Sequence, residues 1–392
     1  MTPQARVQAA IEVLDLIVAA ARSKGAPADR ILSDWFRPRR FAGSKDRRAV
    51  RELVYRAIRA CGDIPANGRA AMLRLVADDP SLAALFTGEG HAPAPIEPGE
   101  PAANAGVAPP WLECRLADSG ITGETAQALL GRAPLDIRVN ALKAARDQIE
   151  LPVPGEPLLA PNALRLPPDT QIEAWDLYQQ GRIEVQDHGS QLTCLAVAAQ
   201  PGETVVDLCA GAGGKTLALA AAMGGRGRLI ACDVDRTRLS RLAPRAARAG
   251  AANIAEGLLD PGREADKLAD LTGRADAVLI DAPCSGTGTW RRNPEARWRL
   301  SEAELARLTA IQARLLDLAA PLVHNGGRLI YVTCSLLDAE GADQIAAFLA
   351  RHPDWRAVPL ALGAGIARGQ GTRLDPLHDQ TDGFFVARLE PM

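Results

Sequence analysis

Two cysteines stand where a thiol could act as a nucleophile. Cys284 comes shortly after the apolar run 277–280, and Cys334 comes shortly after the apolar run 328–332. Short continuous runs of this kind predict parallel strands buried on both faces, and the carboxyl ends of such strands meet at one edge of a sheet. We therefore expect both thiols to lie in one crevice, where a thiolate could attack an electrophilic carbon.

The remaining cysteines are scattered along the chain: Cys61, Cys114, Cys194, Cys209 and Cys232. Seven cysteines without a C-x-x-C pair predict neither a disulfide framework nor a structural zinc site, and we expect no metal. A thiol inside an apolar strand usually serves as a small packing group. That interpretation suits Cys194, Cys209 and Cys232, whereas the two thiols beyond strand ends stand in polar, turn-forming segments and are candidates for catalysis.

A glycine-rich turn comes after the predicted strand 204–208 and leads into a predicted helix. The turn consists of Cys209, Ala210, Gly211, Ala212, Gly213, Gly214 and Lys215. Its glycines let backbone N–H groups approach a ligand closely at the carboxyl end of a strand. A phosphate-binding loop would need glycine in place of Cys209, and a dinucleotide-binding turn would need glycine in place of Thr216. A nucleoside cofactor without a pyrophosphate fits the turn better.

Two carboxylates come after the next two predicted strands. Asp233 ends the run 228–232 and could accept hydrogen bonds from ribose hydroxyls, although it could instead cap the next helix. Asp235 is better placed for that cap. Asp260 lies where a carboxylate could bind an adenine amino group, although a carboxylate before proline is also a common turn element. We expect Asp233 and Asp260 to belong to the cofactor site.

The pattern of the whole chain predicts the elements that hold these segments. From residue 189 to 392, apolar runs alternate with helical stretches, which predicts a Rossmann-like doubly wound α/β sheet. Its helices are expected at 216–223, 236–249, 301–322 and 338–350, with an edge hairpin formed by 355–360 and 383–389. Before it, residues 111–188 predict a small α+β subdomain with strands at 135–139 and 182–185. Residues 1–87 show helical periodicity, and 88–110 form a linker rich in Pro and Gly.

The helical segment is basic. Residues 1–74 carry fifteen Arg and Lys, Lys24 among them, against seven Asp and Glu, although the whole chain has a net charge of −2. A net charge of +8 favours RNA as a partner, and the alternative is a solvated helical face. The candidate RNA-binding residues are Arg37, Arg39, Arg40, Lys45, Arg47 and Arg48. Neither a signal peptide nor an apolar run of membrane-spanning length is recognisable, so we expect a cytoplasmic protein. We also expect a monomer.

Several of these segments together resemble the Sun-type RNA (cytosine-5) methyltransferases. The similar segments are the turn ending Gly-Gly-Lys-Thr, the run Asp-Ala-Pro-Cys-Ser-Gly-Thr-Gly at 281–288 with its continuation Arg-Arg-Asn-Pro, the Thr-Cys-Ser at 333–335, Val-Gln-Asp-His-Gly-Ser-Gln at 185–191, and Asp-Gly-Phe-Phe at 382–385. The resemblance covers nearly the whole chain. One departure is Gly211-Ala212, where many members have Ala-Pro, which leaves the turn more flexible without removing its donors.

The resemblance implies S-adenosylmethionine as the cofactor and C5 of a cytosine in RNA as the methyl acceptor. Cytosine C5 is a poor nucleophile, so a thiolate first attacks C6, and the resemblance assigns this attack to Cys334. It assigns assistance in product release to Cys284, and a hydrogen bond to the N3 edge of the cytosine, beside the cofactor, to Asp281. Lys215 could contact that acid or a substrate phosphate. Arg291 and Arg292 are further candidates for RNA contact.

The RNA itself is suggested by the helical segment. Mainly through residues 46–55, it is similar to the antitermination-factor-like domain fused to bacterial methyltransferases of 16S ribosomal RNA. Transfer RNA and large-subunit RNA are alternatives with the same chemistry. A non-catalytic RNA-binding assembly factor is an alternative of another class, which the intact thiols, acid and turn disfavour. DNA methylation is disfavoured because those enzymes use the cysteine after strand four, and a small-molecule methyltransferase would not need the basic segment.

Overall fold

The structure is a computed structural model that describes residues 1–23 and 25–392. Lys24, one of the basic residues of the helical segment, lies outside the described residues. The chain forms two compact units. The first consists of Met1–Arg132 and Thr289–Ser301, and the second of Ala133–Gly288 and Glu302–Met392. The four-part division predicted from the sequence stays a prediction, and residues 111–132, expected in the α+β subdomain, belong to the first unit.

The first unit is helical, as the periodicity predicts. Its elements are α1 (Pro3–Arg22), α2 (Ala28–Phe36), α3 (Ser44–Ala60), α4 (Gly68–Asp78), η1 (Pro80–Leu85), α5 (Pro110–Asp118), α6 (Gly123–Ala128) and η5 (Pro294–Arg299). Thr2 caps α1 by accepting a hydrogen bond from Ala5 N at 3.2 Å, and Pro3 begins the helix. The predicted apolar stripe of α1, including Leu14 and Ile17, is fully buried.

A segment from the second half of the chain completes this helical unit. Trp298 belongs to the same hydrophobic core as α1 to α4. Arg297 is fully buried, and its guanidinium donates to the backbone oxygens of Ile58 at 2.7 Å and Cys61 at 2.8 Å. Burial lowers the pKa of Arg297 to about 10. Nothing in the local sequence pattern predicts that 289–301, which comes after the predicted catalytic segment, folds with the N-terminal helices.

The second unit contains a small sheet and a large one. The small sheet has the order β2-β3-β1-β4 and is antiparallel throughout. Its elements are β1 (Leu135–Val139), η2 (Arg146–Gln148), β2 (Glu156–Pro157), β3 (Ala163–Leu166), α7 (Asp176–Gln179) and β4 (Ile183–Val185). The predicted strands at 135–139 and 182–185 are thus confirmed. This sheet has a hydrophobic cluster of its own, which includes Ile137 and Ile183.

The large sheet has the order β11-β12-β13-β9-β8-β5-β6-β7, with β10 paired to β13. Its strands are β5 (Thr204–Asp207), β6 (Arg228–Asp233), β7 (Ile254–Leu258), β8 (Ala275–Asp281), β9 (Val323–Thr333), β10 (Trp355–Val358), β11 (Ile366–Arg368), β12 (Gly371–Leu374) and β13 (Phe384–Pro391). Strands β5 to β9 are parallel, and β13 joins β9 antiparallel. The carboxyl ends of β5, β6, β8 and β9 therefore share one edge of the sheet.

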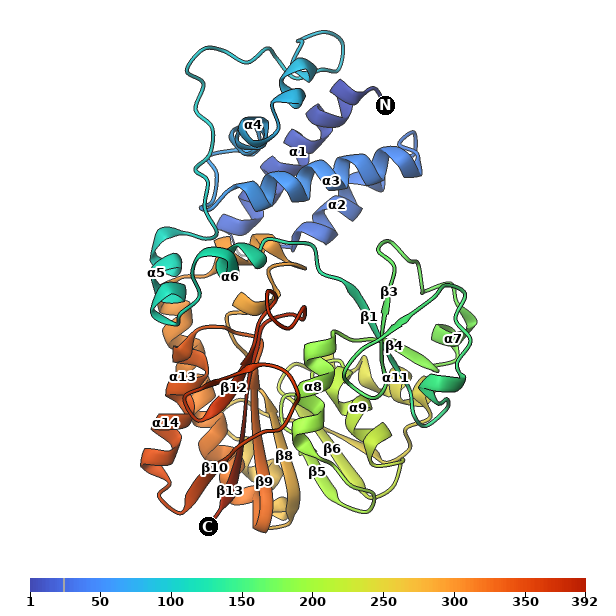
Figure 1. Cartoon of the computed structure of the whole chain (residues 1–392), viewed down its shortest axis with the longest axis vertical. Coiled ribbons are helices and arrows are strands. Elements are labelled where there is room, and N and C mark those ends of the chain that lie inside the picture. The colour runs from blue at the N-terminus through green and yellow to red at the C-terminus, as the bar shows by residue number, and fades with distance from the viewer. Residues whose placement is uncertain (24) are drawn as a thin grey trace. The chain divides into compact units, whose positions relative to one another are not determined.

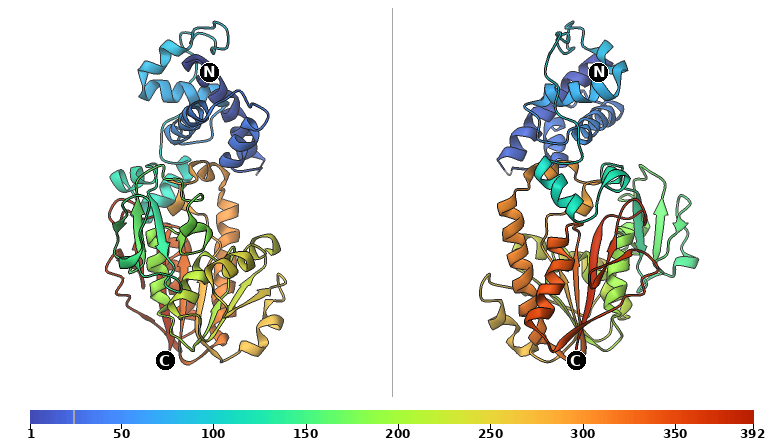
Figure 2. Two further views of the ribbon diagram at one scale, coloured as in Figure 1. Left: turned by 90° about the vertical axis from the view of Figure 1, so that its right-hand side faces the viewer. Right: turned by 60° about the vertical axis from the view of Figure 1, so that its left-hand side comes forward.

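Helices cover both faces of the large sheet, so the fold is doubly wound as predicted (Figure 1). The helices are α8 (His188–Val197), α9 (Gly214–Ala222), α10 (Arg236–Leu239), α11 (Leu242–Ala249), α12 (Glu264–Leu268), α13 (Glu302–Ala319) and α14 (Ala342–Arg351). Short turns η3 (Ala269–Leu271), η4 (Thr287–Thr289), η6 (Ala320–Leu322) and η7 (Asp338–Glu340) connect them. The core on one face comes from α8, α9 and α11, and that on the other from α12, α13 and α14; both layers can be followed in Figure 2.

Two predicted helices are interrupted, each for a visible reason. The helix expected at 236–249 is broken between α10 and α11, because Pro244 has no N–H with which a continuous helix could bond residue 240. The helix expected at 338–350 begins only at Ala342. Gly341, with φ −129° and ψ −97°, separates it from η7, and a Cβ there would lie 2.7 Å from the ring of Phe385.

The end of the chain also differs from the expected edge hairpin. Strands β10 and β13 do pair, but β13 lies inside the sheet, between β9 and β12, and β11 pairs with β12 beyond it. Strands β11 and β12 are three and four residues long and were missed because runs this short carry little periodicity. As a result β9, which leads to Cys334, lies between β8 and β13 and is largely buried.

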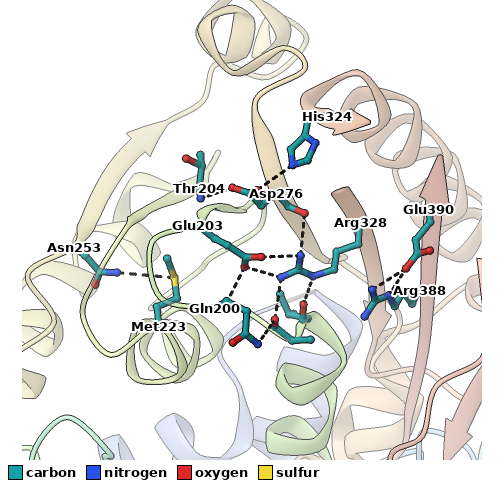
Figure 3. Close-up of polar contacts among 12 residues, drawn as sticks. Gln200, Glu203, Thr204, Met223, Asn253, Asp276, His324, Arg328, Arg388 and Glu390 are labelled. Atoms are coloured by element: carbon teal, nitrogen blue, oxygen red, sulfur yellow. Dashed lines mark hydrogen bonds and ion pairs between the residues drawn. The ribbon is translucent and has the colours of Figure 1, made fainter. Parts of the chain in front are cut away.

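Arg328 ties the opposite, amino-terminal edge of the large sheet together (Figure 3). Its side chain is 8% exposed and donates to both carboxylate oxygens of Glu203, at 2.7 and 3.0 Å, and to the backbone oxygen of Ala198 at 3.0 Å. Replacing Arg328 with Ala leaves the Glu203 carboxylate with the bond from Gln200 N but without its charged donor, and it removes the donor to the backbone oxygen of Ala198. We expect Arg328→Ala to lower the free energy of unfolding by about 2–4 kcal/mol in urea titrations. A loss below about 0.5 kcal/mol would show that water replaces these contacts.

Candidate active site

The glycine-rich turn links β5 to α9 in a conformation that needs glycine. Gly211 has φ +55° and Gly213 has φ +86°, both in the left-handed region. A Cβ on Gly213 would lie 2.2 Å from Leu242 of α11, so the turn passes too close to that helix for any side chain. A Cβ on Gly214 would meet nothing within 4 Å. The turn is therefore packed on one side and open at the first residue of α9.

Asp233 lies at the end of β6, directly against this turn. It is 6% exposed, and its Oδ2 accepts a hydrogen bond from Gly211 N at 2.7 Å. Its Oδ1 accepts from Asp235 N at 2.7 Å. The predicted cap of the next helix is Asp235, and this is confirmed, because Asp235 accepts from Arg238 N at 3.0 Å. Asp233 is thereby free of the capping role and is fixed beside the turn, whereas Asp260 is exposed after β7.

Lys215 contacts the acid, which answers the question that the sequence left open. Its Nζ lies 2.7 Å from Oδ2 of Asp281, at the end of β8, and 5.6 Å from the ring centre of Phe384. Burial is the largest single influence and lowers the pKa of Lys215, but the charge and hydrogen bond of Asp281, together with Cys194 and Cys334, outweigh it, so the net pKa is raised above its ordinary value. Lys215 is therefore a fixed cation that neutralises Asp281.

Three carboxylates lie around the turn, at the ends of adjacent strands. Asp207, Asp233 and Asp281 line the ends of three adjacent strands, and the lysine of the turn is already paired. Burial raises the pKa of Asp207 to about 7, and Thr216 donates to its carboxylate at 2.6 Å. Asp233 is the carboxylate that suits ribose hydroxyls, because a carboxylate accepts hydrogen bonds from them.

The two candidate cysteines lie side by side, as predicted. Cys284 Sγ and Cys334 Sγ are 3.3 Å apart, and both residues are partly exposed. The pKa of the Cys284 thiol is raised well above its ordinary value, first by its hydrogen bond to Cys334, then by burial and by the negative charges of Cys334 and Glu340. Either sulfur can be the donor of the hydrogen bond between them, so the geometry makes the two thiols partners without fixing which one holds the proton.

The other cysteines fall largely where packing predicts them. Cys61, Cys194 and Cys232 are buried, Cys209 is intermediate, and Cys114 is exposed. Among residues 1–23 and 25–392 there is no group of three or more His, Cys, Asp or Glu side chains that could hold a metal ion.

Contacts within the second unit explain two further segments that carried the sequence resemblance. Gly383 N donates to Gly288 O at 2.8 Å, and a Cβ on Gly288 would lie 2.1 Å from Gly383 O. Asp187 caps α8 and also accepts from Asp382 N at 3.1 Å. The late Asp-Gly-Phe-Phe segment thus holds the end of the Cys284 loop on one side and the start of α8 on the other.

The candidate RNA-binding residues divide into two groups. Arg37 pairs with Asp34, Arg39 lies over the ring of Trp35 at 3.8 Å, and Arg47 donates to Ala42 O at 2.9 Å. Arg40, Lys45 and Arg48 are exposed or partly exposed, together with Phe41, whose exposed fraction is 74%. Arg291 is 7% exposed and Arg292 is intermediate. RNA contact by these residues stays a prediction.

Sequence reasoning gave no role to the polar side chains that connect the two cysteine loops, although three of them stand in the quoted segments 281–288 and 333–335. These are Ser285, Thr287, Gln312, Ser335 and Glu340, of which the last four are buried. Serine, threonine and glutamine carry no motif on their own, and Glu340 stands in a stretch that the periodicity assigned to a helix. Only the fold brings them together.

The fold and the site together define a methyltransferase of the doubly wound class. A family model described as 16S rRNA methyltransferase RsmB/F matches residues 194–390, which is half of the chain. The chain belongs to this family. S-adenosylmethionine is the cofactor of such a methyltransferase, and we expect its site at the turn after β5 and the acids at the strand ends.

Individual relatives agree with this family. The chain is 39% identical over 272 residues to a probable ribosomal RNA small subunit methyltransferase B from Synechocystis, covering 65% of this chain and 60% of that protein. The crystal structure of PH0851 has a TM-score of 0.76 at 26% identity and covers 100% of this chain and 99% of that one. A methyltransferase homologue from Pyrococcus horikoshii has a TM-score of 0.58 at 25% identity, covering 72% and 100%. The chain spans about three-fifths to two-thirds of the length of the curated relatives it matches.

The position of Asp233 leads to a prediction about cofactor affinity. Its carboxylate is buried beside the turn and has lone pairs left for ribose hydroxyls, so Asp233→Ala removes charge-assisted hydrogen bonds worth about 1.5–3 kcal/mol. We expect the Kd for S-adenosylmethionine to rise by roughly 10- to 150-fold in isothermal titration. Asp235→Ala, which removes a helix cap but no cofactor contact, is the matched control. An unchanged Kd for Asp233→Ala would remove this residue from the cofactor site.

Proposed function

We propose that this chain transfers a methyl group from S-adenosylmethionine to C5 of a cytosine in 16S ribosomal RNA, through a covalent bond between Cys334 and C6 of the base. The observation that carries this proposal is the distance of 3.3 Å between two thiols at the ends of the adjacent strands β8 and β9. One buried thiol would be an ordinary packing group, but two at one sheet edge, beside an acid, form a nucleophile with a partner.

The first step is the attack of Cys334. Its sulfur forms a bond to C6 of the cytosine, the electrons of the C5–C6 double bond move toward C4 and N3, and N3 takes a proton from solvent, which makes C5 nucleophilic. N3 returns this proton to solvent when the C5–C6 double bond is restored. Asp281, held by Lys215, faces the N3 edge and stabilises that proton. S-adenosylmethionine, when bound, supplies an electrophilic methyl group, which C5 accepts.

Release then depends on Cys284. Once the sulfur of Cys334 is bonded to carbon, it is an uncharged thioether, so the hydrogen bond and the negative charge that raised the pKa of Cys284 are lost. Cys284 can then give its own proton to solvent and take the proton from C5. The electrons of the C5–H bond restore the C5–C6 double bond, and Cys334 leaves as a thiolate. Bonding of Cys334 to the base therefore removes two of the causes that raise the pKa of Cys284, while burial and the charge of Glu340 remain.

The basic surface of the first unit is the proposed RNA grip. Arg40, Lys45 and Arg48 are exposed cations within eight residues of Phe41 in the sequence, and the exposed ring of Phe41 offers a face for an unpaired base. A target base in a loop or single strand is the form that such an enzyme can reach. We further expect the protein to act as a monomer in the cytoplasm.

This grip predicts a change in the salt dependence of RNA binding. The triple variant Arg40→Ala, Lys45→Ala, Arg48→Ala removes up to three phosphate contacts, so the slope of log Kd against log salt should fall by about 2. Fluorescence anisotropy with a labelled 16S fragment would measure it. Arg307→Ala, an exposed arginine of α13 that pairs with Glu304, should leave the slope unchanged. An equal slope for the triple variant and the parent protein would place the RNA elsewhere.

The activity itself is tested by methylation of transcripts. The protein is incubated with methyl-labelled S-adenosylmethionine and with 16S, 23S or transfer RNA transcripts, and the modified base is mapped. The proposal predicts 5-methylcytosine at one site of 16S RNA. Label in transfer RNA or 23S RNA alone would keep the chemistry and change the substrate, and no label in any RNA, despite cofactor binding, would contradict the proposal.

A further inference from the structure

Glu340 is a buried carboxylate that the chemistry proposed for the two cysteines does not use. It ends η7, five residues after the Thr-Cys-Ser segment, and its exposed fraction is 0%. The groups that donate hydrogen bonds to its carboxylate are all neutral: the backbone N–H of Ser285, the hydroxyl of Ser285 and the side-chain amide of Gln312. Burying a carboxylate without a cation beside it is costly, so this residue is expected to have a task that offsets the cost.

These contacts hold the residue directly after Cys284. Oε1 of Glu340 accepts from Ser285 N at 2.8 Å, and Oε2 accepts from Ser285 Oγ. Both the backbone and the side chain of Ser285 are therefore fixed by one carboxylate.

Gln312 of α13 connects Glu340 to the residue before Cys284. Its Nε2 donates to Oε1 of Glu340 at 3.0 Å and also to the backbone oxygen of Pro283 at 2.9 Å. The side chain of Gln312 is fully buried. Cys284 is thus held on both sides, through Pro283 and through Ser285, by the pair Glu340 and Gln312.

The same network connects the loop of Cys284 to the loop of Cys334. Ser335 Oγ lies 3.2 Å from Ser285 Oγ and 3.1 Å from Thr287 Oγ1, and Gly288 N donates to Cys334 O at 3.0 Å. On the other side of Glu340, its backbone oxygen accepts from the hydroxyl of Tyr331 at 2.8 Å. Neither cysteine loop can move away from the other without breaking buried hydrogen bonds.

We propose that Glu340 is a positioning residue for product release: through Ser285 and Gln312 it holds Cys284 in reach of the base that is bonded to Cys334. The inference rests on the proposed function, because it concerns the release step of that reaction. The negative charge of Glu340 also contributes to the raised pKa of Cys284, after the contributions of Cys334 and of burial. Glu340 touches neither the base nor the cofactor in this mechanism, and it acts only through the neighbours of Cys284.

The test compares Glu340→Ala with Cys284→Ala in the full-length protein. Each variant is mixed with labelled RNA and S-adenosylmethionine, and two quantities are measured: the methyl groups transferred in the first turnover, and the fraction of protein in a complex with RNA that resists denaturant. Since a positioned acid–base group contributes about 10²–10⁴-fold, we expect Glu340→Ala to release RNA at least about 100-fold more slowly than the parent protein. It should therefore accumulate the covalent complex as Cys284→Ala does. Loss of a merely structural residue would lower both quantities together and would trap no complex.

Two further variants separate position from stability. Glu340→Gln keeps the shape of the side chain and one acceptor oxygen. Its rate of RNA release should therefore lie within about tenfold of the parent rate, which corresponds to the loss of a single charged hydrogen bond. Gln312→Met keeps the side-chain volume but removes the hydrogen bond to Pro283. It should trap an amount of complex between those of the parent protein and Cys284→Ala. This variant tests the positioning role if Glu340→Ala does not fold. Glu203→Ala, which removes a carboxylate from the opposite edge of the same sheet, is the matched control and should trap none.

The outcomes distinguish this inference from the proposed function. If Cys284→Ala traps the RNA while Glu340→Ala and Gln312→Met release it at the parent rate, the positioning role is overturned and the proposed function stands. If Cys284→Ala itself traps no RNA, the release role of Cys284 fails, and the inference fails with it.

Discussion

The Cys334→Ala protein is expected to bind S-adenosylmethionine and RNA normally but to lose methyl transfer. Without a sulfur to bond C6, the ring keeps its aromatic electrons and C5 stays unreactive, so the step is left without its nucleophile. We expect the single-turnover rate with labelled cofactor to fall by at least about 10⁴-fold, because covalent attack is the largest chemical contribution in the mechanism. No covalent complex with RNA should form.

The control for this variant is a second cysteine-to-alanine change. Cys114 is exposed and lies in the first unit, so Cys114→Ala should keep the full rate. Cofactor affinity, measured by titration, should be the same for both variants. A Cys334→Ala protein that methylates RNA at more than about a tenth of the parent rate would remove Cys334 from the mechanism.

The second large effect is expected from Cys284→Ala, at the release step that follows methyl transfer. This variant keeps the nucleophile, so the first methyl group should be transferred at close to the parent rate. The C5 proton then has no acceptor, because the sulfur that should take it is gone, and the RNA stays bonded to Cys334. We expect one methyl group per protein molecule, no further turnover, and a complex that survives denaturing electrophoresis.

The raised pKa of Cys284 gives a second readout for the pair of thiols. The hydrogen bond to Cys334 is the first cause of that rise, so the Cys284 thiol should react with iodoacetamide more slowly in the parent protein than in Cys334→Ala. A rise in pKa by one unit corresponds to about a tenfold smaller thiolate fraction. Full turnover by Cys284→Ala would contradict the division of roles. An equal alkylation rate of Cys284 in the parent protein and in Cys334→Ala, measured by peptide maps at neutral pH, would contradict the influence of Cys334 on that thiol.

Much of the geometry of the candidate site was predictable because its residues follow strand ends. The runs before Gly211, Asp233, Cys284 and Cys334 are short, apolar and continuous. Once these runs are interpreted as parallel strands, the sheet places the residues at their carboxyl ends along one edge. The contact between Cys284 and Cys334 results from this rule together with the adjacency of β8 and β9. The fold class results from the same alternation of strands and helices.

The parts that were not predictable depend on packing between distant segments. Glu340 and Gln312 acquire their task only because η7 and α13 come to the same loop, and neither residue type signals a function by itself. The same holds for Arg297, which folds with helices more than two hundred residues earlier in the chain. The pairing of Lys215 with Asp281, left open by the sequence, was settled by a distance of 2.7 Å.

The proposed attack by Cys334 is tested most directly by identifying the atom that carries the RNA. An RNA with 5-fluorocytosine at the target position can accept the attack and the methyl group, but it offers no C5 proton to remove, so the complex cannot resolve. After digestion by protease and nuclease, mass spectrometry locates the modified cysteine. The mechanism predicts the nucleotide on the peptide that contains Cys334, with Cys284 unmodified. A nucleotide on Cys284, or cofactor-dependent methylation of unmodified RNA with no trapped complex from the fluorinated one, would contradict it.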